Sequence, residues 1–396
     1  METVFIVDGV RSAIGTFGGS LKDVAPTTLA AKCIEAVVQR SGIDADEVGH
    51  VVMGNVIHTQ PSDMYLSRVA AIEAGIPKEA PAFTLNRLCG SGVQAVVSAA
   101  QTIMLGDTDC AIAGGAESMS RAPHSTQAAR WGTRFGDQSV TDMLIGALTD
   151  PFGNGHMGVT AENVADRWDV SREAQDRFAL KSQRRAAAAI DEGRFRTQIL
   201  PLEVKAKGKV VTFDTDEHVK RDTTLDGLGG LKPAFKAGGS VTAGNSSGVN
   251  DGGAALLLMG EGKVKSANVK PMARIIGYAH AGVDPSEMGV GPIPAVKALL
   301  ARTGMKAFEF SVIECNEAFA SQSCAVAREL ELDPETLNPN GGAIALGHPI
   351  GATGSIIIVK TLYELQRTGG RYGLVTMCIG GGQGIALAIE NLSTAS

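Results

Sequence analysis

The order of strand-like and helix-like segments is the same near both ends of this chain of 396 residues. In each set, a β-like run leads to a helical pattern and then to a second β-like run that ends in a polar residue. The first set comprises residues 4–7, 26–40 and 50–55, and the second comprises residues 273–278, 294–303 and 311–316. Alternating strands and helices predict an α/β fold, and their recurrence predicts two like halves.

A glycine-rich turn leads into a long helix in both halves, and each turn holds one residue able to do chemistry. Cys89 stands in Cys89-Gly90-Ser91-Gly92, ahead of an apolar helical pattern over residues 93–104. His348 stands in His348-Pro349-Ile350-Gly351, ahead of a helical pattern over residues 355–366. If the halves correspond, both residues lie at equivalent helix starts and face one another across a pseudo-twofold axis.

Cys89 is the candidate nucleophile. The free N–H groups and the dipole at a helix N-terminus favour negative charge, so we expect the pKa of its thiol to be lowered. A neutral imidazole at His348 can take the Cys89 proton. The alternatives are a buried structural cysteine and a structural histidine, which are the common roles of these residue types.

Two further polar residues end strands in the C-terminal half. Cys378 precedes Gly380-Gly381-Gly382, where backbone N–H groups are free to bind an oxyanion. A second thiol suits the abstraction of a weakly acidic C–H proton, because a general base needs a pKa near the working pH. Asn316 can orient a water or donate to an oxyanion, and its alternative is a turn asparagine. The glycine run leads into a strand at residues 385–389 and not into a helix, which excludes a dinucleotide site.

Composition narrows the classes of function. Hydrophobic residues make up 44% of the chain, charged residues 20%, and the net charge is −6, so no nucleic-acid or membrane-surface partner is expected. The apolar runs are too short to span a bilayer. The six cysteines form no CxxC pair, which argues against disulfides and zinc and for reduced thiols in the cytoplasm. The first residues read as a strand, so we expect no targeting segment.

The regular alternation of strand-like and helix-like segments is interrupted between the two halves. Residues 120–249 hold both tryptophans, a helix over 171–190 with Ser171 as its N-cap and Gly193 beyond its end, and polar loops over 205–221. We interpret this region as an inserted lid. The predicted units are the N-terminal half of the core at 1–119, a loop domain at 120–249, and the C-terminal half at 250–396.

Four sequence blocks together resemble those of the thiolases, and the likeness extends over essentially the whole chain. It is strongest toward the bacterial β-ketothiolases, the acetyl-CoA acetyltransferases of polyhydroxyalkanoate synthesis, including their broad-range type for short acyl groups. The blocks are Asn86-Arg87-Leu88-Cys89-Gly90-Ser91-Gly92, Asn316-Glu317-Ala318-Phe319, Asn338-Pro339-Asn340-Gly341-Gly342 with Gly347-His348-Pro349-Ile350-Gly351-Ala352-Thr353-Gly354, and Cys378-Ile379-Gly380-Gly381-Gly382-Gln383-Gly384.

The resemblance implies a fold and partners. Each half would be a βαβαβαββ unit, and the two would form a five-layered αβαβα core covered by the loop domain. The protein would be a tight homodimer, and a tetramer in the manner of biosynthetic members. It would use no metal and no redox cofactor, and acyl-CoA and CoA would be its substrates.

The resemblance also implies residue roles. Cys89 would carry the acyl group after activation by His348, and Cys378 would deprotonate the methyl group of acetyl-CoA. His348 and a water on Asn316 would form one oxyanion hole, and the backbone N–H groups of Cys89 and Gly380 would form the other. The CoA tunnel would be lined by Leu148, His156, Met157, Ala243, Ser247 and Phe319, with Lys220 and Phe235 nearer the nucleotide end.

Two positions depart from the family pattern. Cys315 stands where an apolar residue is expected and adds a third thiol near the site. Lys220 stands where several relatives have arginine, and the two cations bind phosphate with different geometry.

The sequence thus predicts a reversible, thiol-dependent Claisen condensation of two acyl-CoA molecules to 3-ketoacyl-CoA by a ping-pong route. The nearest alternative is a decarboxylating ketoacyl synthase of the same fold, which would rely on histidine or asparagine and not on Cys378. A non-catalytic acyl-CoA-binding protein would keep the pocket without the reactive set, and a thiol-redox protein is disfavoured by the absence of CxxC.

Overall fold

The computed structural model describes residues 2–206 and 208–393, and strands from both halves join in one sheet. The N-terminal strands lie in the spatial order β1, β13, β5, β3, β4, and the C-terminal strands in the order β14, β17, β16, β15. The two sets meet where β1 and β14 pair through Phe5 and Arg274. These strands are β1 (Val4–Ser12), β3 (His50–Gly54), β4 (Ala82–Leu85), β5 (Cys110–Ser118), β13 (Asn250–Gly260), β14 (Ala273–Gly282), β15 (Val312–Cys315), β16 (Tyr372–Ile379) and β17 (Gln383–Asn391).

The pairing pattern is the same in both halves. In the N-terminal half, β1 pairs antiparallel with β13, β13 pairs antiparallel with β5, and β5 pairs parallel with β3. In the C-terminal half, β14, β17, β16 and β15 pair in the same order and the same directions. A single parallel bridge between Ile313 and Leu337 stands in the C-terminal half where β4 stands in the N-terminal half. This common order confirms the predicted duplication.

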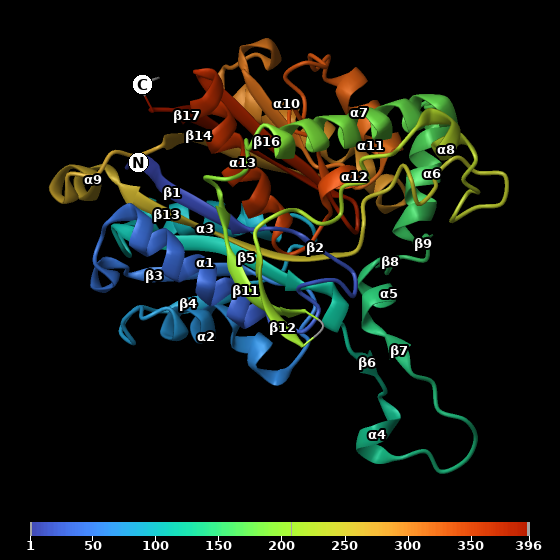
Figure 1. Cartoon of the computed structure of the whole chain (residues 1–396), viewed down its shortest axis with the longest axis horizontal. Coiled ribbons are helices and arrows are strands. Elements are labelled where there is room, and N and C mark those ends of the chain that lie inside the picture. Colours follow the sequence, from blue (N-terminus) through green and yellow to red (C-terminus); the bar gives the residue numbers. More distant parts are fainter. Residues whose placement is uncertain (1, 207, 394–396) are drawn as a thin grey trace.

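Helices cover the outer faces of the two strand sets and fill the space between them. α1 and α2 pack outside the N-terminal strands, α3 and α13 pack against each other in the middle, and α10 covers the C-terminal strands. Figure 1 shows this stacking, with the blue N-terminal layers below and the orange and red C-terminal layers above. The result is the expected five-layered αβαβα core. The helices are α1 (Pro26–Ser41), α2 (Leu66–Glu73), α3 (Ser91–Leu105), α10 (Pro292–Thr303) and α13 (Thr353–Thr368).

The two central helices cross at their first turns. A Cβ added to Gly92 would lie under 3.0 Å from the Ser355 backbone nitrogen, and one added to Gly354 equally close to that of Val93. Because glycine has no Cβ, the two backbones can approach this closely. The Ser355 hydroxyl also donates to the Gly92 carbonyl oxygen over 3.2 Å. The crossing brings together the turns that precede the two helices.

One segment, Leu88–Leu105, is long and apolar enough to cross a membrane by length and composition alone. It contains α3, in which Val96, Ala99 and Ile103 are fully buried between the two halves. A helix buried over most of its surface in the core of a large protein is expected to be this apolar. Its place in the fold therefore accounts for its composition.

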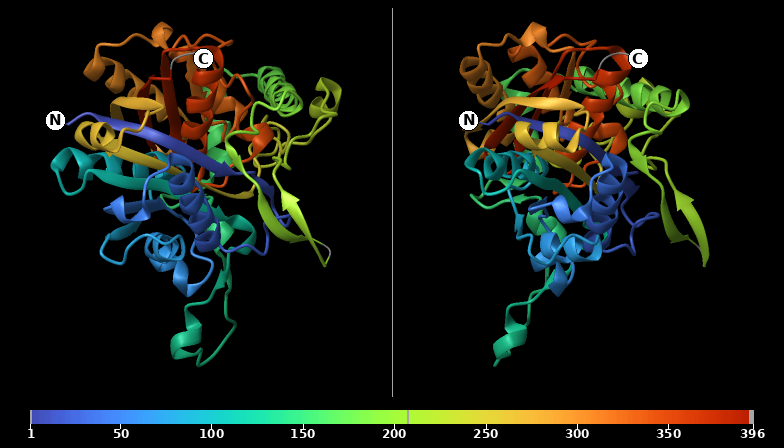
Figure 2. Two further views of the ribbon diagram at one scale, coloured as in Figure 1. Left: turned by 60° about the vertical axis from the view of Figure 1, so that its left-hand side comes forward. Right: turned by 90° about the vertical axis from the view of Figure 1, so that its left-hand side faces the viewer.

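The region between the halves contains long helices and an extended arm. α6 (Met157–Arg167) and α7 (Arg172–Asp191) pack on α11 (Ala320–Glu329). Figure 2 shows, from two further sides, the arm extending away from the core, and a separate hairpin projecting from another side of the core. The arm consists of β6 (His124–Ser125), α4 (Ala128–Trp131), β7 (Thr141–Asp142) and α5 (Met143–Ala147), and the hairpin of β11 (Leu202–Ala206) and β12 (Lys209–Phe213).

Two sequence expectations bear on this region. Ser171 caps α7, since its side chain accepts a hydrogen bond from the Ala174 N–H over 3.2 Å, as predicted. After the insert the chain returns to the N-terminal sheet as β13, between β1 and β5. Residues 250–260, which the sequence assigned to the C-terminal half, thus hydrogen-bond with N-terminal strands.

Candidate active site

Cys89 occupies a tight turn between β4 and α3. Leu88, just before it, has a φ of 45°, a left-handed conformation that is uncommon for residues other than glycine. The turn is held by Ser91, whose Oγ accepts from the Arg87 N–H over 2.8 Å and donates to the Leu88 carbonyl oxygen over 2.7 Å. Backbone strain of this kind persists only where surrounding bonds enforce it, and it is concentrated at active sites.

Cys89 is only 5% exposed, and this burial sets the protonation state of its thiol. Burial raises the pKa of its thiol from 9.0 to about 11, although the N–H groups of Gly380 and of Cys89 itself act to lower it. The expectation of a lowered pKa is therefore wrong for the free protein, because desolvation of the thiolate outweighs the helix dipole. Cys89 rests as a thiol and needs a base to become a nucleophile.

His348 is able to serve as that base through its Nε2. Its Nδ1 lies 2.6 Å from Thr353 Oγ1, and that hydroxyl donates its only proton to the Pro349 carbonyl oxygen over 2.9 Å. Thr353 Oγ1 must then accept from Nδ1–H, which leaves Nε2 without a proton. Burial lowers the pKa of His348 from 6.5 to about 4, so the imidazole is neutral near pH 7.

Cys378 lies fully buried near the end of β16, in an apolar cluster with Met157, Ala318 and Phe319. Burial raises the pKa of its thiol well above 9.0, and a thiolate at the neighbouring Cys89 would raise it further. Two residues later, the Gly380 N–H lies near enough to Cys89 to act to lower the pKa of its thiol. The end of β16 therefore supplies both a second thiol and a backbone donor beside the first.

Asn316 follows β15 and lies beside the imidazole. Its Nδ2 is 3.4 Å from His348 Nε2, which places an amide donor against the unprotonated nitrogen. Its own N–H donates to the Thr376 carbonyl oxygen over 3.0 Å and so anchors it to β16. Its Oδ1 is buried and accepts no hydrogen bond within residues 2–206 and 208–393. The structure thus brings together all five residues predicted to act in catalysis.

A cavity of about 260 Å³ opens onto Cys89 and His348. Aromatic rings wall it: the His156 ring stacks on Phe235 with centroids 4.9 Å apart, and Phe235 meets Phe319 edge to face. An apolar cavity that ends at a nucleophile suits the flexible arm of a thioester. Six of the eight residues predicted for CoA line it, namely Leu148, His156, Met157, Phe235, Ser247 and Phe319.

The other two predicted CoA residues and the third thiol lie outside this cavity. Ala243 and Lys220 are exposed, and the Lys220 backbone N–H donates to Gln183 Oε1 over 2.8 Å. Cys315 is buried, and burial raises the pKa of its thiol to about 12. Such a thiol is inert as a nucleophile.

Sequence reasoning missed three residues of the site. Thr353 orients the imidazole, and its only signal was a hydroxyl five residues after the candidate base. Glu117, at the end of β5, accepts from the Gly351 N–H over 2.8 Å and so holds the turn that follows His348. Met288 lines the cavity from a short 3-10 helix, and nothing in its sequence surroundings marks it.

Comparison with known proteins agrees with this geometry. The family profile for the thiolase N-terminal domain matches residues 4–262, and that for the thiolase C-terminal domain matches residues 269–391. The chain is 59% identical to beta-ketothiolase BktB of Cupriavidus necator, over 98% of this chain and 99% of that protein. It is 48% identical to an acetyl-CoA acetyltransferase of Syntrophomonas wolfei, again over 98% and 99%.

Solved structures show the same relationship. Human mitochondrial 3-ketoacyl-CoA thiolase has a TM-score of 0.97 at 44% identity, over 99% of each chain. A second crystal structure of that enzyme, in complex with CoA, has a TM-score of 0.96. Both halves of the chain, its order of strands and its site therefore lead to one conclusion: this protein is a member of the thiolase family.

Proposed function

We propose that the protein is an acyl-CoA:acetyl-CoA C-acyltransferase that forms and cleaves 3-ketoacyl-CoA through an acyl-enzyme. The observation that carries the proposal is the meeting of two thiols with a neutral imidazole whose Nε2 carries no proton. Its relatives are named for the same chemistry. Acetoacetyl-CoA and slightly longer 3-ketoacyl-CoAs are the proposed products.

In the first half-reaction, His348 Nε2 takes the Cys89 proton and the Cys89 sulfur attacks the thioester carbonyl. The bond from carbon to Cys89 forms and the bond from carbon to CoA breaks. Cys378, which its raised pKa keeps protonated, gives its proton to the departing CoA thiolate. Protonated His348 and a water held by Asn316 oppose the charge that develops on the carbonyl oxygen.

In the second half-reaction, the Cys378 thiolate removes a proton from the methyl group of acetyl-CoA. The resulting carbanion attacks the acyl carbon, so that a carbon–carbon bond forms and the bond to Cys89 breaks. His348 returns its proton to the Cys89 thiolate, which restores all three groups. The N–H groups of Cys89 and Gly380 are the proposed donors to the tetrahedral oxyanion.

The pantetheine arm of CoA is proposed to lie in the cavity beside the Phe235 and Phe319 rings. Lys220 keeps its predicted role toward the nucleotide end, where an exposed side chain suits a charged, solvated group, and Ala243 keeps its predicted place along the CoA tunnel. Steady-state rates of thiolysis for acetoacetyl-, 3-ketovaleryl- and 3-ketohexanoyl-CoA would define the acyl chain length that the cavity accepts.

Substitution of the two thiols tests the division of labour. Cys89→Ser should abolish both turnover and labelling by radioactive acetyl-CoA. Cys378→Ser should still be labelled on Cys89 but should fail to condense. Cys324→Ser is the matched control, because Cys324 lies outside the cavity and its pKa is raised to about 12 by burial. Near-normal turnover of Cys89→Ser, or loss of labelling in Cys378→Ser, would contradict the proposed roles.

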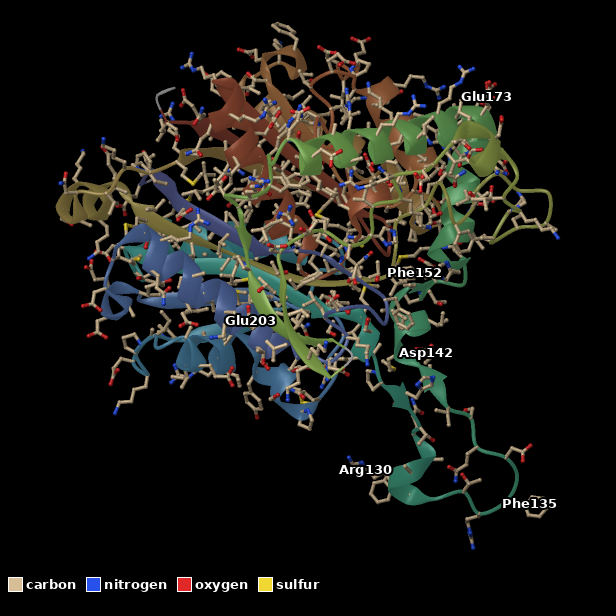
Figure 3. All side chains as sticks on the ribbon, viewed as in Figure 1. Arg130, Phe135, Asp142, Phe152, Glu173 and Glu203 are labelled. Carbon is tan, nitrogen blue, oxygen red and sulfur yellow. The ribbon has the colours of Figure 1, made fainter. Side chains whose placement is uncertain are left out.

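The assembly and the location are also proposed from the surface of the chain. The arm exposes Trp131 by 88% and Phe135 by 98%, and Figure 3 shows Arg130 and Phe135 at its tip, pointing away from the core. At the end of the sheet, β4 pairs only with β3 within the described residues and exposes Phe83 by 41%. We propose that β4 forms a dimer contact and the arm a tetramer contact, because such surfaces mark interfaces. All six cysteines are free, as in a reducing cytoplasm.

A further inference from the structure

A buried ion pair lies near Asn316, and neither of its residues lines the substrate cavity. Lys360 of α13 donates from Nζ to Glu314 Oε2 over 2.8 Å and to the Gly341 carbonyl oxygen over 2.7 Å. Both side chains of the pair are only 2% exposed. Glu314 lies on β15, two residues before Asn316. Side chains two residues apart along an extended chain point to the same face, so the Glu314 carboxylate and the Asn316 amide do so here. An ion pair removed from water is costly, which calls for a reason for its presence here.

A small cavity joins the pair to Asn316. Its volume is about 10 Å³, and its lining includes Glu314, Asn316, Thr353 and Lys360. That is the space of one water molecule, which needs two to four polar partners. Two of the lining residues each have a buried oxygen, Glu314 Oε1 and Asn316 Oδ1, that accepts no hydrogen bond from the described residues. The Lys360 ammonium has three N–H groups and uses two of them.

We propose that Lys360 and Glu314 are positioning residues, which hold the Asn316 amide through one water bound in this cavity. The water accepts from the third Lys360 N–H and donates to Glu314 Oε1 and to Asn316 Oδ1. Every buried polar atom of the group then has a partner. The inference rests on the proposed role of Asn316 beside His348.

The arrangement decides which end of the Asn316 amide faces the imidazole. When the water donates to Oδ1, the other end of the amide, Nδ2, faces His348 Nε2, and the two nitrogens are 3.4 Å apart. If the amide turned over, Oδ1 would favour a proton on Nε2, and that nitrogen would no longer accept the Cys89 proton. The pair thus keeps the base in its working form without contacting the substrate.

Two double variants of nearly the same shape test the proposal. K360M/E314Q removes both charges but keeps a carboxamide able to donate to the water, and K360M/E314M removes the polar group altogether. Neither variant leaves a buried charge unpaired, which is what makes single substitutions of such pairs damaging. We expect K360M/E314Q to keep kcat for acetoacetyl-CoA thiolysis within about threefold of wild type. We expect K360M/E314M to lose about 10- to 100-fold in kcat, with KM for CoA unchanged, because a displaced catalytic group costs this much.

The same pair of variants in an Asn316→Ala background separates positioning from general damage. There, the two double variants should have equal kcat, because the group through which they act is absent. Equal kcat of the two variants with Asn316 present, or a difference that persists with Asn316→Ala, would overturn the inference while leaving the proposed reaction intact. Wild-type kcat in Asn316→Ala alone would instead remove the proposed role of Asn316, and this inference with it. Urea midpoints and molar mass in solution verify that each variant is folded.

Discussion

At the scale of single residues, the Thr353 hydroxyl determines which nitrogen of the His348 imidazole carries the proton. Because the Thr353 hydroxyl donates its only proton to the Pro349 carbonyl oxygen, it must act as the acceptor toward Nδ1–H. We expect Thr353→Val to reduce kcat for thiolysis by about 10- to 100-fold, less than the whole contribution of a general base. The reason is that Nδ1–H loses its acceptor, and the proton is then free to reside on Nε2. Stopped-flow measurement of acyl-enzyme formation would show the loss in the first half-reaction.

The same helix offers a matched control for this prediction. Thr361 is equally buried, and its hydroxyl donates to the Ile357 carbonyl oxygen over 2.7 Å, far from the imidazole. Thr361→Val should keep wild-type kcat, and Thr353→Ser should recover most of the lost rate because serine keeps the acceptor. If Thr353→Val and Thr361→Val reduced the rate equally, the hydroxyl would have no special part in orienting His348.

Cys89 shows why a residue's chemistry is hard to read from its neighbours in sequence. The glycines and the helix start that follow it predict a stabilised thiolate. In the fold, the same turn places the sulfur where water is excluded, and burial raises its pKa to about 11. The helix dipole is a fixed local property, whereas desolvation depends on what the rest of the chain packs around the sulfur. The sequence therefore predicted where Cys89 stands, just before a helix, but not the resting state of its thiol.

At the scale of elements, the site depends on the crossing of α3 and α13. The crossing is possible because Gly92 and Gly354 have no side chains. Gly354→Ala should lower the free energy of unfolding by about 1–3 kcal/mol or more, since its Cβ would press on the Val93 backbone. It should also reduce kcat, because the turns that hold Cys89 and His348 would move apart. Urea denaturation and thiolysis rates on the same sample measure both effects.

Gly262→Ala is the matched control for this element. Gly262 lies in the helix α9 (Glu261–Ala267), and a Cβ added there would meet no atom within 4 Å. Alanine at this position should raise the free energy of unfolding by about 0.5–1 kcal/mol, as it does in open helix positions. If Gly354→Ala were as well tolerated as Gly262→Ala, the close crossing would not be what positions the two turns.

The sequence was informative wherever a local pattern determines the structure. The spacing of apolar residues and the position of glycines at turns predicted the helices and strands. The recurrence of these elements predicted that Cys89 and His348 precede corresponding helices. The strand β13 illustrates where such reasoning fails. Its apolar residues predict a buried strand, but its pairing with β1 rather than with a C-terminal strand is a long-range choice that no local pattern encodes. Glu117 and Lys360 escaped for the same reason, since their partners lie on other elements, whereas Thr353 escaped because a hydroxyl five residues after a histidine is too weak a signal.

At the scale of the whole molecule, the arm is the feature that a single chain leaves unexplained. It exposes Trp131 and Phe135 to solvent and departs from the core over most of its length (Figures 1 and 3). Monomeric proteins rarely place such rings where nothing covers them. Yet the base of the arm is part of the site, since Leu144 and Ile145 of α5 line the substrate cavity. Assembly through the arm would therefore hold one wall of that cavity in place.

We expect the double variant W131S/F135S to halve the molar mass of the assembly measured by light scattering, leaving the dimer that we attribute to β4. Its kcat per subunit should fall only slightly, because the substituted rings do not line the cavity. Its melting temperature should fall clearly, because the cavity wall at α5 loses its support. The hairpin offers the matched control: V210S/V211S removes apolar side chains that are 62% and 40% exposed on another projecting element and should leave the mass unchanged. A halved mass in both variants would point to general loss of exposed apolar surface, and an unchanged mass in W131S/F135S would show that these rings are not the contact. Only a response confined to the arm fits a molecule in which the segment that joins the subunits also completes the site.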